Sequence, residues 1–198
     1  MEILHQVLQQ LINGISLGSI YALIALGYTM IYGIIKLINF AHGDIYMVGA
    51  YIGFFAITQA HLSIVPSLLI SLVVTGFLGM LVERLAYKPL RHAPRISVLI
   101  TAIGVSFFLE YTTMYFVSPT PRTFPAMFGD VAVTVGGIVI NGQQMLILGI
   151  TAVLMVILTY IVQKTKTGKA MRAASFDTET AELMGINSDR IILSLIHI

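Results

Sequence analysis

The chain has no cysteine, no tryptophan and little charge. Asp, Glu, Lys and Arg make up only 10% of its 198 residues, against about 25% in a typical soluble domain. Without cysteine, disulfide bonds are excluded, and cysteine usage says nothing about the redox compartment. The sequence has no Cys/His cluster and no H-E-x-x-H motif, so no metal site is expected.

Apolar residues take the place of the missing charge. They make up 57% of the chain, against about 45–50% in soluble proteins, and the mean hydropathy is +0.91. The sequence therefore predicts an all-α integral membrane protein, with residues 1–198 forming one polytopic helical bundle. We expect a first span over residues 11–35, a second ending near 60, a third ending near 82, a fourth over 96–117, a fifth over 145–162, and a truncated sixth at the end.

The basic residues predict the orientation of these spans. If five spans alternate from an external N-terminus, ten of the eleven Lys and Arg residues fall on one side, and only Arg122 falls on the other. Basic residues collect on the cytoplasmic side of membrane proteins, so residues 164–190 are expected in the cytosol. The ten are Lys36, Arg84, Lys88, Arg91, Arg95, Lys164, Lys166, Lys169, Arg172 and Arg190.

Residues 164–190 form the one long polar segment of the chain. At 100° per residue a helix would place Ala170, Ala173, Ala174, Asp177, Ala181 and Met184 on one face. Small side chains let another surface come close, and an acid facing that surface would need a cationic partner. Gly185 followed by Asn187 predicts a helix end, and Ser188 or Asp189 predicts the cap of the next helix. An ordinary solvated connecting loop is the alternative interpretation.

The external loop, residues 118–144, opens with Pro119, Pro121 and Pro125, which exclude helix there. Two short alternating runs separated by Gly136 and Gly137 then predict a β-hairpin. The loop is either a plain lid or a docking surface for an external partner.

The motifs give little support for an enzyme. Gly14, Ser16 and Gly18 match the G-x-S-x-G pattern of hydrolases, which requires a strand-to-helix elbow. The same glycines, like Gly49 and Gly53, match G-x-x-x-G, a close-packing face of membrane helices, and we favour packing. The stretch TGKA, residues 167–170, lacks the glycine-rich lead of a phosphate loop. We expect no cofactor and no catalytic residue, and any nucleotide-driven work would need a partner subunit.

Polar residues inside the apolar spans are functional candidates, because burying them in a membrane is costly. Asn39, His42 and Asp44 cluster around Gly43, a spacing that suits a broken or re-entrant helix lining a cavity, or an interfacial cap at the cytosolic mouth. Glu110 lies about two helical turns inside the outer end of its span. It must be paired, protonated or facing water, and we favour a partner on a neighbouring helix.

Three stretches resemble a known family: SLGSIYALIALGYTMIYGIIKLINFAHGDIYMVGAY, ERLAYKPLR and TGKAMRAASFDTETAELMGIN. They are similar to the permeases of bacterial high-affinity branched-chain amino acid ABC importers, of the LivH type. The resemblance implies a type II ABC importer-like permease subunit of the inner membrane that is itself not an enzyme and carries leucine, isoleucine and valine inward by alternating access. Related permeases carry urea or short amides, and the residues alone leave a stand-alone secondary transporter open. The family's permeases are longer, so the resemblance implies that this chain is their N-terminal part.

The resemblance also implies partners. These are a second permease subunit in a heterodimer, two cytosolic ATPase subunits, a periplasmic binding protein and the lipid bilayer, with no nucleic acid. Residues 168–187 are similar to the EAA-type coupling loop, which seats in a cleft of the ATPase, although Ala173-Ala174 stands where the family pattern has an acid before the alanines. The matching positions are Gly168, Ala173, Asp177, Ala181, Gly185, Ile186 and Asn187. Asn39, His42, Gly43, Asp44 and Glu110 are our candidates for the translocation pathway.

Overall fold

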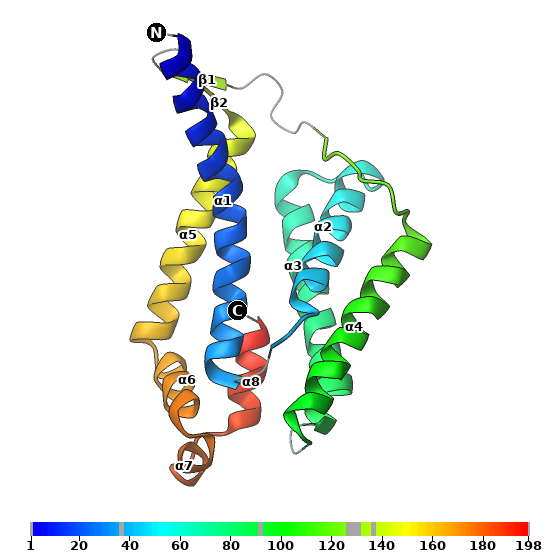
Figure 1. Cartoon of the computed structure of the whole chain (residues 1–198), viewed down its shortest axis with the longest axis vertical. Coiled ribbons are helices and arrows are strands. Elements are labelled where there is room, and N and C mark those ends of the chain that lie inside the picture. Colours follow the sequence, from blue (N-terminus) through cyan, green and yellow to red (C-terminus); the bar gives the residue numbers. More distant parts are fainter. Residues whose placement is uncertain (1, 36–37, 91–92, 126–131, 136–137, 198) are drawn as a thin grey trace. The chain divides into compact units, whose positions relative to one another are not determined.

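The computed structural model describes residues 2–35, 38–90, 93–125, 132–135 and 138–197, and it is mostly helical (Figure 1). Its contacts divide the chain into two compact units. One comprises residues 1–27 and 126–169, and the other comprises residues 28–125 and 170–198. Lys36 and Arg91, which contributed to the expected orientation, lie outside the described residues, as do Gly136 and Gly137.

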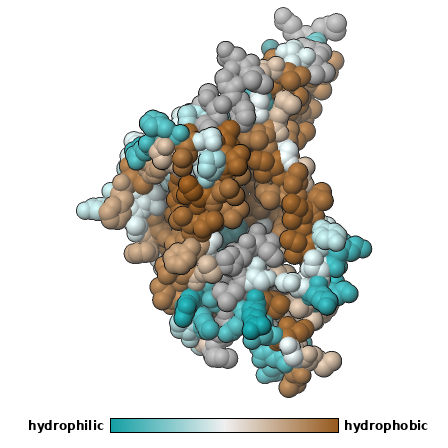
Figure 2. Space-filling model, turned by 180° about the vertical axis from the view of Figure 1, so that it is seen from behind, coloured by the Kyte–Doolittle hydropathy of each residue, from teal (hydrophilic) through white to brown (hydrophobic). Residues whose placement is uncertain are grey.

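Within the described residues, four helices are long and apolar enough to cross a membrane: Ile3–Gly33, Ile64–Leu90, Ile96–Phe116 and Gly142–Lys164. They correspond to the first, third, fourth and fifth expected spans. The second expected span forms α2 (His42–Thr58), which at 17 residues is shorter than these four. Figure 2 shows apolar side chains over most of the middle of the face in view, and hydrophilic ones at its lower end and at a few points of the upper edge.

The first unit holds most of α1 (Glu2–Ile35) together with residues 126–169, which include a small sheet. Strand β1 (Ala132–Val135) pairs antiparallel with β2 (Ile138–Asn141), and Val135 lies opposite Ile138. This confirms the hairpin predicted from the two glycines. Helix α5 (Gly142–Lys164) follows directly, and Asn141 and Gln144 form a capping box at its start.

Side-chain amides fasten the hairpin and α5 to α1. Gln9 Nε2 donates to the Val139 carbonyl and the Val139 N–H donates to Gln9 Oε1, each over 2.8 Å. One turn further along α1, Asn13 Oδ1 accepts a hydrogen bond of 2.9 Å from Gln144 Nε2. The hairpin is therefore tied to the N-terminal part of α1.

In the second unit, α2 packs against α3 (Ile64–Val82) through glycine. Gly49 is buried, and its carbonyl accepts a hydrogen bond of 2.6 Å from Ser71 Oγ. A Cβ at Gly53 would lie 3.9 Å from the Ser71 Cβ. The predicted packing role of Gly49 and Gly53 is thus confirmed. A Cβ at Gly14 or Gly18 would meet no described atom within 4 Å.

Helix α3 continues into a π-helix, η1 (Glu83–Tyr87), and a short 3₁₀ turn, η2 (Lys88–Leu90), before α4 (Arg95–Phe116). After α4, residues 118–125 contain no helix, as the prolines predict. Arg122 lies over the rings of Phe54 and Phe55, 5.9 Å from each centroid. This cation–π contact holds the segment after α4 against the end of α2.

The polar segment forms two helices where the sequence predicts one. They are α6 (Lys166–Phe176) and α7 (Thr178–Leu183), and α8 (Ser188–His197) follows. Gly185 has a φ of +86°, which confirms the predicted stop. The cap of α8 differs from the expected Ser188 or Asp189: Asn187 Oδ1 accepts a 3.0 Å hydrogen bond from the Arg190 N–H.

Candidate functional site

The polar segment has its own apolar core. Met171, Ala174, Ala181 and Ile191 are buried together, and Met30, Ala170 and Ile186 pack against them. This cluster joins α6, α7 and α8 to the C-terminal part of α1. The segment is therefore a folded element, and the alternative of an ordinary solvated loop does not describe it.

Asp177 lies at the break between α6 and α7, where its backbone is extended. Its carboxylate is fully exposed and accepts hydrogen bonds from the Thr180 hydroxyl and from the Thr180 N–H, the latter over 3.2 Å. These bonds, the hydroxyl's first, hold the pKa of Asp177 below its usual value. The expectation that Asp177 lies in the middle of one continuous helix is therefore wrong, because it caps α7 instead. A short acidic side chain competes with the helix for backbone N–H groups, so it becomes a cap.

The small side chains do not form a single exposed face either. Ala174 and Ala181 are buried in the segment's own core, whereas Ala173 and Met184 are exposed. The break at Asp177 changes the rotation between the two helices, so a single helical wheel misplaces the residues beyond it. Most of the predicted small face stabilises the segment itself.

Three large apolar side chains of the segment are exposed instead. Phe176 is 91% exposed, Leu183 88% and Met184 81%. The sequence interpretation missed Phe176 and Leu183 because it followed the alanines. Their signal was available in the sequence, since large apolar residues in an otherwise polar segment are candidates for a contact surface.

Two glycines are needed by the backbone of the segment. Gly168 is buried, and its N–H donates a hydrogen bond of 3.1 Å to Thr165 Oγ1. A Cβ at Gly168 would collide with the backbone carbonyls of Ile161 and Val162. Gly185 adopts the left-handed conformation that L-residues with a side chain rarely take. Both positions therefore fix how the segment turns.

A cluster of polar contacts surrounds the start of α2. Residues 38–41 are not helical, and α2 begins at His42, which confirms the predicted helix break. Asn39 Oδ1 accepts a 2.7 Å hydrogen bond from the Tyr87 hydroxyl on η1. Asp44 accepts one from the Ser106 hydroxyl on α4, and the His42 ring lies edge-on to Tyr28 with 6.1 Å between centroids. Polar groups from four parts of the second unit thus meet around this break, beside an exposed Gly43.

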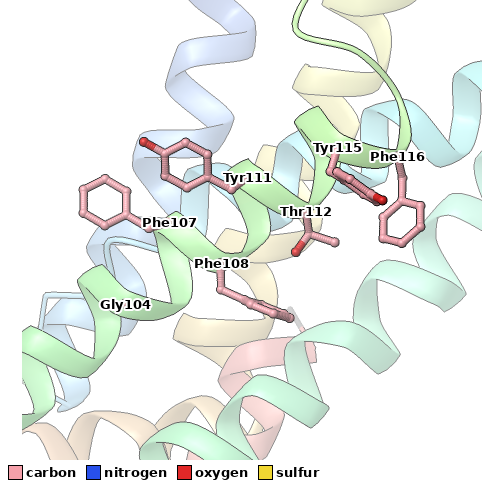
Figure 3. Close-up of a pocket in the computed structure, with 7 residues that line it drawn as sticks. All are labelled: Gly104, Phe107, Phe108, Tyr111, Thr112, Tyr115 and Phe116. Carbon is pink, nitrogen blue, oxygen red and sulfur yellow. The ribbon is translucent and has the colours of Figure 1, made fainter.

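Glu110 lies elsewhere on α4 and is exposed. In the part of the chain that the structure describes, no side chain pairs with it, so the expected partner on a neighbouring helix is not provided there. A groove of about 430 Å³ runs over the same half of α4 (Figure 3). Its lining, all from α4, is Gly104, Phe107, Phe108, Tyr111, Thr112, Tyr115 and Phe116. A groove lined by one helix is a helix face rather than an enclosed site.

The hydrolase alternative does not fit the structure. Ser16 lies in the middle of α1, where its hydroxyl donates a hydrogen bond of 2.9 Å to the Ile12 carbonyl one turn earlier. The strand-to-helix elbow that would expose a nucleophilic serine is absent from this helix. Ser16 is therefore a helix residue whose hydroxyl bonds to the backbone.

Long apolar helices, a glycine-packed helix pair and a folded polar segment define a multi-pass α-helical membrane protein. Residues 10–198 match the model of the branched-chain amino acid transport system / permease component family. The chain belongs to this family.

Curated relatives agree with this assignment. The permease protein BraD of a high-affinity branched-chain amino acid transport system in Pseudomonas aeruginosa is 43% identical over 96% of this chain and 66% of its own length. LivH permease proteins of such systems are 40% identical in Escherichia coli and 38% in Salmonella typhimurium, over 93% of this chain and 64% of their own length. The chain thus spans about two thirds of the length of these relatives. No solved structure matches it.

Proposed function

We propose that this chain is the N-terminal part of a permease subunit that carries leucine, isoleucine and valine into the cytoplasm. It does so by alternating access, as one subunit of an ATP-driven ABC importer of the bacterial inner membrane. The family membership and the names of the relatives support this cargo and role. In this proposal the present chain contributes five spans and the start of a sixth to the subunit, in a type II importer-like arrangement.

The exposed cluster of Phe176, Leu183 and Met184 carries the proposal of an ATPase partner. In the proposed orientation the cluster lies outside the membrane, so lipid cannot cover these side chains. Water is a poor environment for them, because each large apolar side chain gains about 1.5–3 kcal/mol on burial. A cytosolic subunit that covers the cluster gains this energy and holds α6 and α7 firmly. We take residues 164–190 as the coupling segment, with Ala173 and Asp177 at its exposed surface.

The other coupling positions act through the fold of the segment. Ala181 and Ile186 belong to its core, while Gly168, Gly185 and Asn187 set its turns and the start of α8. ATP-driven movement of the partner would therefore shift α6, α7 and α8 as one packed element. The chain has no phosphate loop, so hydrolysis takes place in two partner ATPase subunits. A second permease subunit and a periplasmic binding protein complete the importer.

For the translocation pathway we propose Asn39, His42, Gly43, Asp44 and Glu110. Polar side chains within membrane spans are rare and usually face a cavity or a protein partner. The break before α2 brings Asn39, His42 and Asp44 together with hydroxyl groups from η1 and α4. Polar groups grouped in this way offer a cargo hydrogen-bonding partners that lipid does not.

The test uses the full-length permease co-expressed with its ATPase, second permease and binding protein. Phe176→Ser with Leu183→Ser should leave membrane insertion unchanged, because both side chains are almost fully exposed. ATPase retention on purification should fall by about tenfold or more, which corresponds to about 1.4 kcal/mol of lost binding. ATP-dependent leucine uptake should fall with it.

Glu182→Gln on α7 is the matched control, because it removes an exposed charge and no apolar surface. Asp177→Arg and bulky residues at Ala181 are less informative, since they disturb the α7 cap and the buried core. Normal ATPase retention in the double variant would refute the contact. For the cargo, uptake of labelled leucine is compared with labelled urea, and transport of urea alone would reject branched-chain amino acids.

A further inference from the structure

Two consecutive residues after α3 contact two different parts of the second unit. The Tyr87 hydroxyl donates a 2.7 Å hydrogen bond to Asn39 in the break before α2. Lys88 Nζ forms an ion pair with Asp189 Oδ2 at the start of α8, over 3.1 Å. Asn39 and Asp189 lie about 150 positions apart along the chain. They are therefore far from each other in sequence, although both contact the Tyr87–Lys88 pair.

The π-helix explains how neighbouring residues reach so far apart. Tyr87 is the last residue of η1, and Lys88 begins the tighter turn η2. A change from a wide to a tight helix alters the direction in which successive side chains point, and π-helices are frequent at functional sites. Tyr87 is half-buried, whereas the Lys88 side chain is 53% exposed.

Asp189 belongs to the coupling segment. It follows the Asn187 cap of α8, and α8 packs along α3 and against α7. On the other side, Asn39 is itself one of the proposed pathway residues, five positions before Asp44. The Tyr87–Lys88 pair therefore bridges the coupling segment and the candidate pathway by direct contacts.

We propose that Tyr87 and Lys88 are positioning residues that transmit movement of the coupling segment to the helix break around Asn39. This inference rests on the proposed function of the segment. Lys88 connects η2 to the start of α8 through its ion pair with Asp189. Tyr87, the residue before it, connects the end of η1 to the helix break through its hydrogen bond to Asn39. A shift of α8 then moves the break without any contact between the ATPase and the pathway.

The Lys88–Asp189 pair suits a test because it adds little to folding. Its side chains are 53% and 48% exposed, and ion pairs of that exposure contribute little to stability. Loss of coupling on breaking the pair would therefore not be a consequence of unfolding. Exchanging the two charges distinguishes the effect of the ion pair from other effects of either residue. If the ion pair itself matters, the double exchange restores function, because it restores the pairing of opposite charges.

The experiment uses the complete importer in proteoliposomes and measures ATP hydrolysis and leucine uptake separately. Lys88→Glu and Asp189→Lys alone should each keep the ATPase bound and active, while leucine carried per ATP falls roughly two- to fivefold. The double exchange, Lys88→Glu with Asp189→Lys, should restore most of the ratio, and Lys88→Arg should keep it. Lys88→Gln serves as a neutral variant if a reversed charge prevents folding, with the same fall expected.

Tyr87→Phe removes only the hydroxyl and should lower the same ratio. Tyr46→Phe is its matched control, on a half-exposed tyrosine of α2, and should not. An unchanged ratio in the folded single variants, or a double exchange that restores nothing, overturns the inference. Absence of ATP-driven leucine uptake by the unmodified importer would instead reject the proposed function itself.

Discussion

Ser71 on α3 donates a hydrogen bond of 2.6 Å to the backbone carbonyl of Gly49 on α2. The contact requires a residue without a side chain, because a Cβ at Gly49 would lie 2.7 Å from Thr75 Oγ1. Lipid provides no hydrophobic force that draws helices together, so close packing and interhelical hydrogen bonds hold them. Gly49 is therefore a main determinant of the α2–α3 pair.

Gly49→Ala should destabilise the folded protein by roughly 1–3 kcal/mol, the usual cost of overpacking. Thr75 is β-branched, and its side chain has only two common χ1 rotamers in a helix. Gly53→Ala is the matched control, because its Cβ would meet Ser71 at an ordinary 3.9 Å. Denaturation of the full-length protein in detergent measures both. Equal stability of the two variants would show that α2 and α3 separate without cost.

Asp44→Asn should keep the fold and lower leucine uptake. An asparagine carbonyl still accepts the hydrogen bond from Ser106, whereas the charge is lost. Asp44→Ala also leaves the Ser106 hydroxyl without this partner, which should cost a further 1 kcal/mol or so of stability. Stability curves and initial uptake rates distinguish the two effects. If Asp44→Asn transports normally, the carboxylate charge has no part in the pathway.

Gly168→Ala should open the turn between α5 and α6, because the new methyl group would collide with two backbone carbonyls. The expected penalty is about 1–3 kcal/mol, concentrated in this turn. Tryptic cleavage at Lys166 and Lys169 should be several-fold faster as the turn opens. Gly149→Ala on α5 is the control, since its Cβ would meet no atom within 4 Å. Identical cleavage of both variants would contradict this account.

The cap of α7 should weaken in acid. The pKa of Asp177 is lowered in the folded state by its bonds from Thr180, so its contribution is complete above the ordinary value of 3.8. It is lost as the pH falls below that value and through the lowered folded pKa. Hydrogen exchange at the Thr180 amide, corrected for its intrinsic rate, should therefore accelerate on acidification. Asp177→Asn can still cap but does not titrate there, so its corrected exchange should be much less sensitive to pH.

Much of the fold follows from short-range pattern in the sequence. The long apolar runs predict α1, α3, α4 and α5 because a helix satisfies its own backbone in lipid. The hairpin follows from two glycines between alternating runs, and the stop at Gly185 follows from its freedom at positive φ. Each of these features depends on residues within one or two turns.

The other features of the fold and of the candidate site depend on contacts between residues far apart in the sequence, which local sequence patterns do not predict. Tyr87 reaches Asn39 across 48 positions and Ser106 reaches Asp44 across 62, and the π-helix that aims Tyr87 has no compositional signature. The break at Asp177 could have been found, because Asp is a preferred N-cap residue and Glu179 supplies an acid in the first turn after it. Regular alanine spacing on both sides favoured a continuous helix instead.

The side-chain amide of Gln9 occupies both backbone groups of Val139, as an added strand would. At that residue β2 has no free donor or acceptor to recruit a foreign strand, which guards this edge against aggregation. The hairpin also cannot swing independently of the first helix while these two bonds persist. A molecule that binds the hairpin would therefore transmit force directly to α1 through the two hydrogen bonds of Gln9.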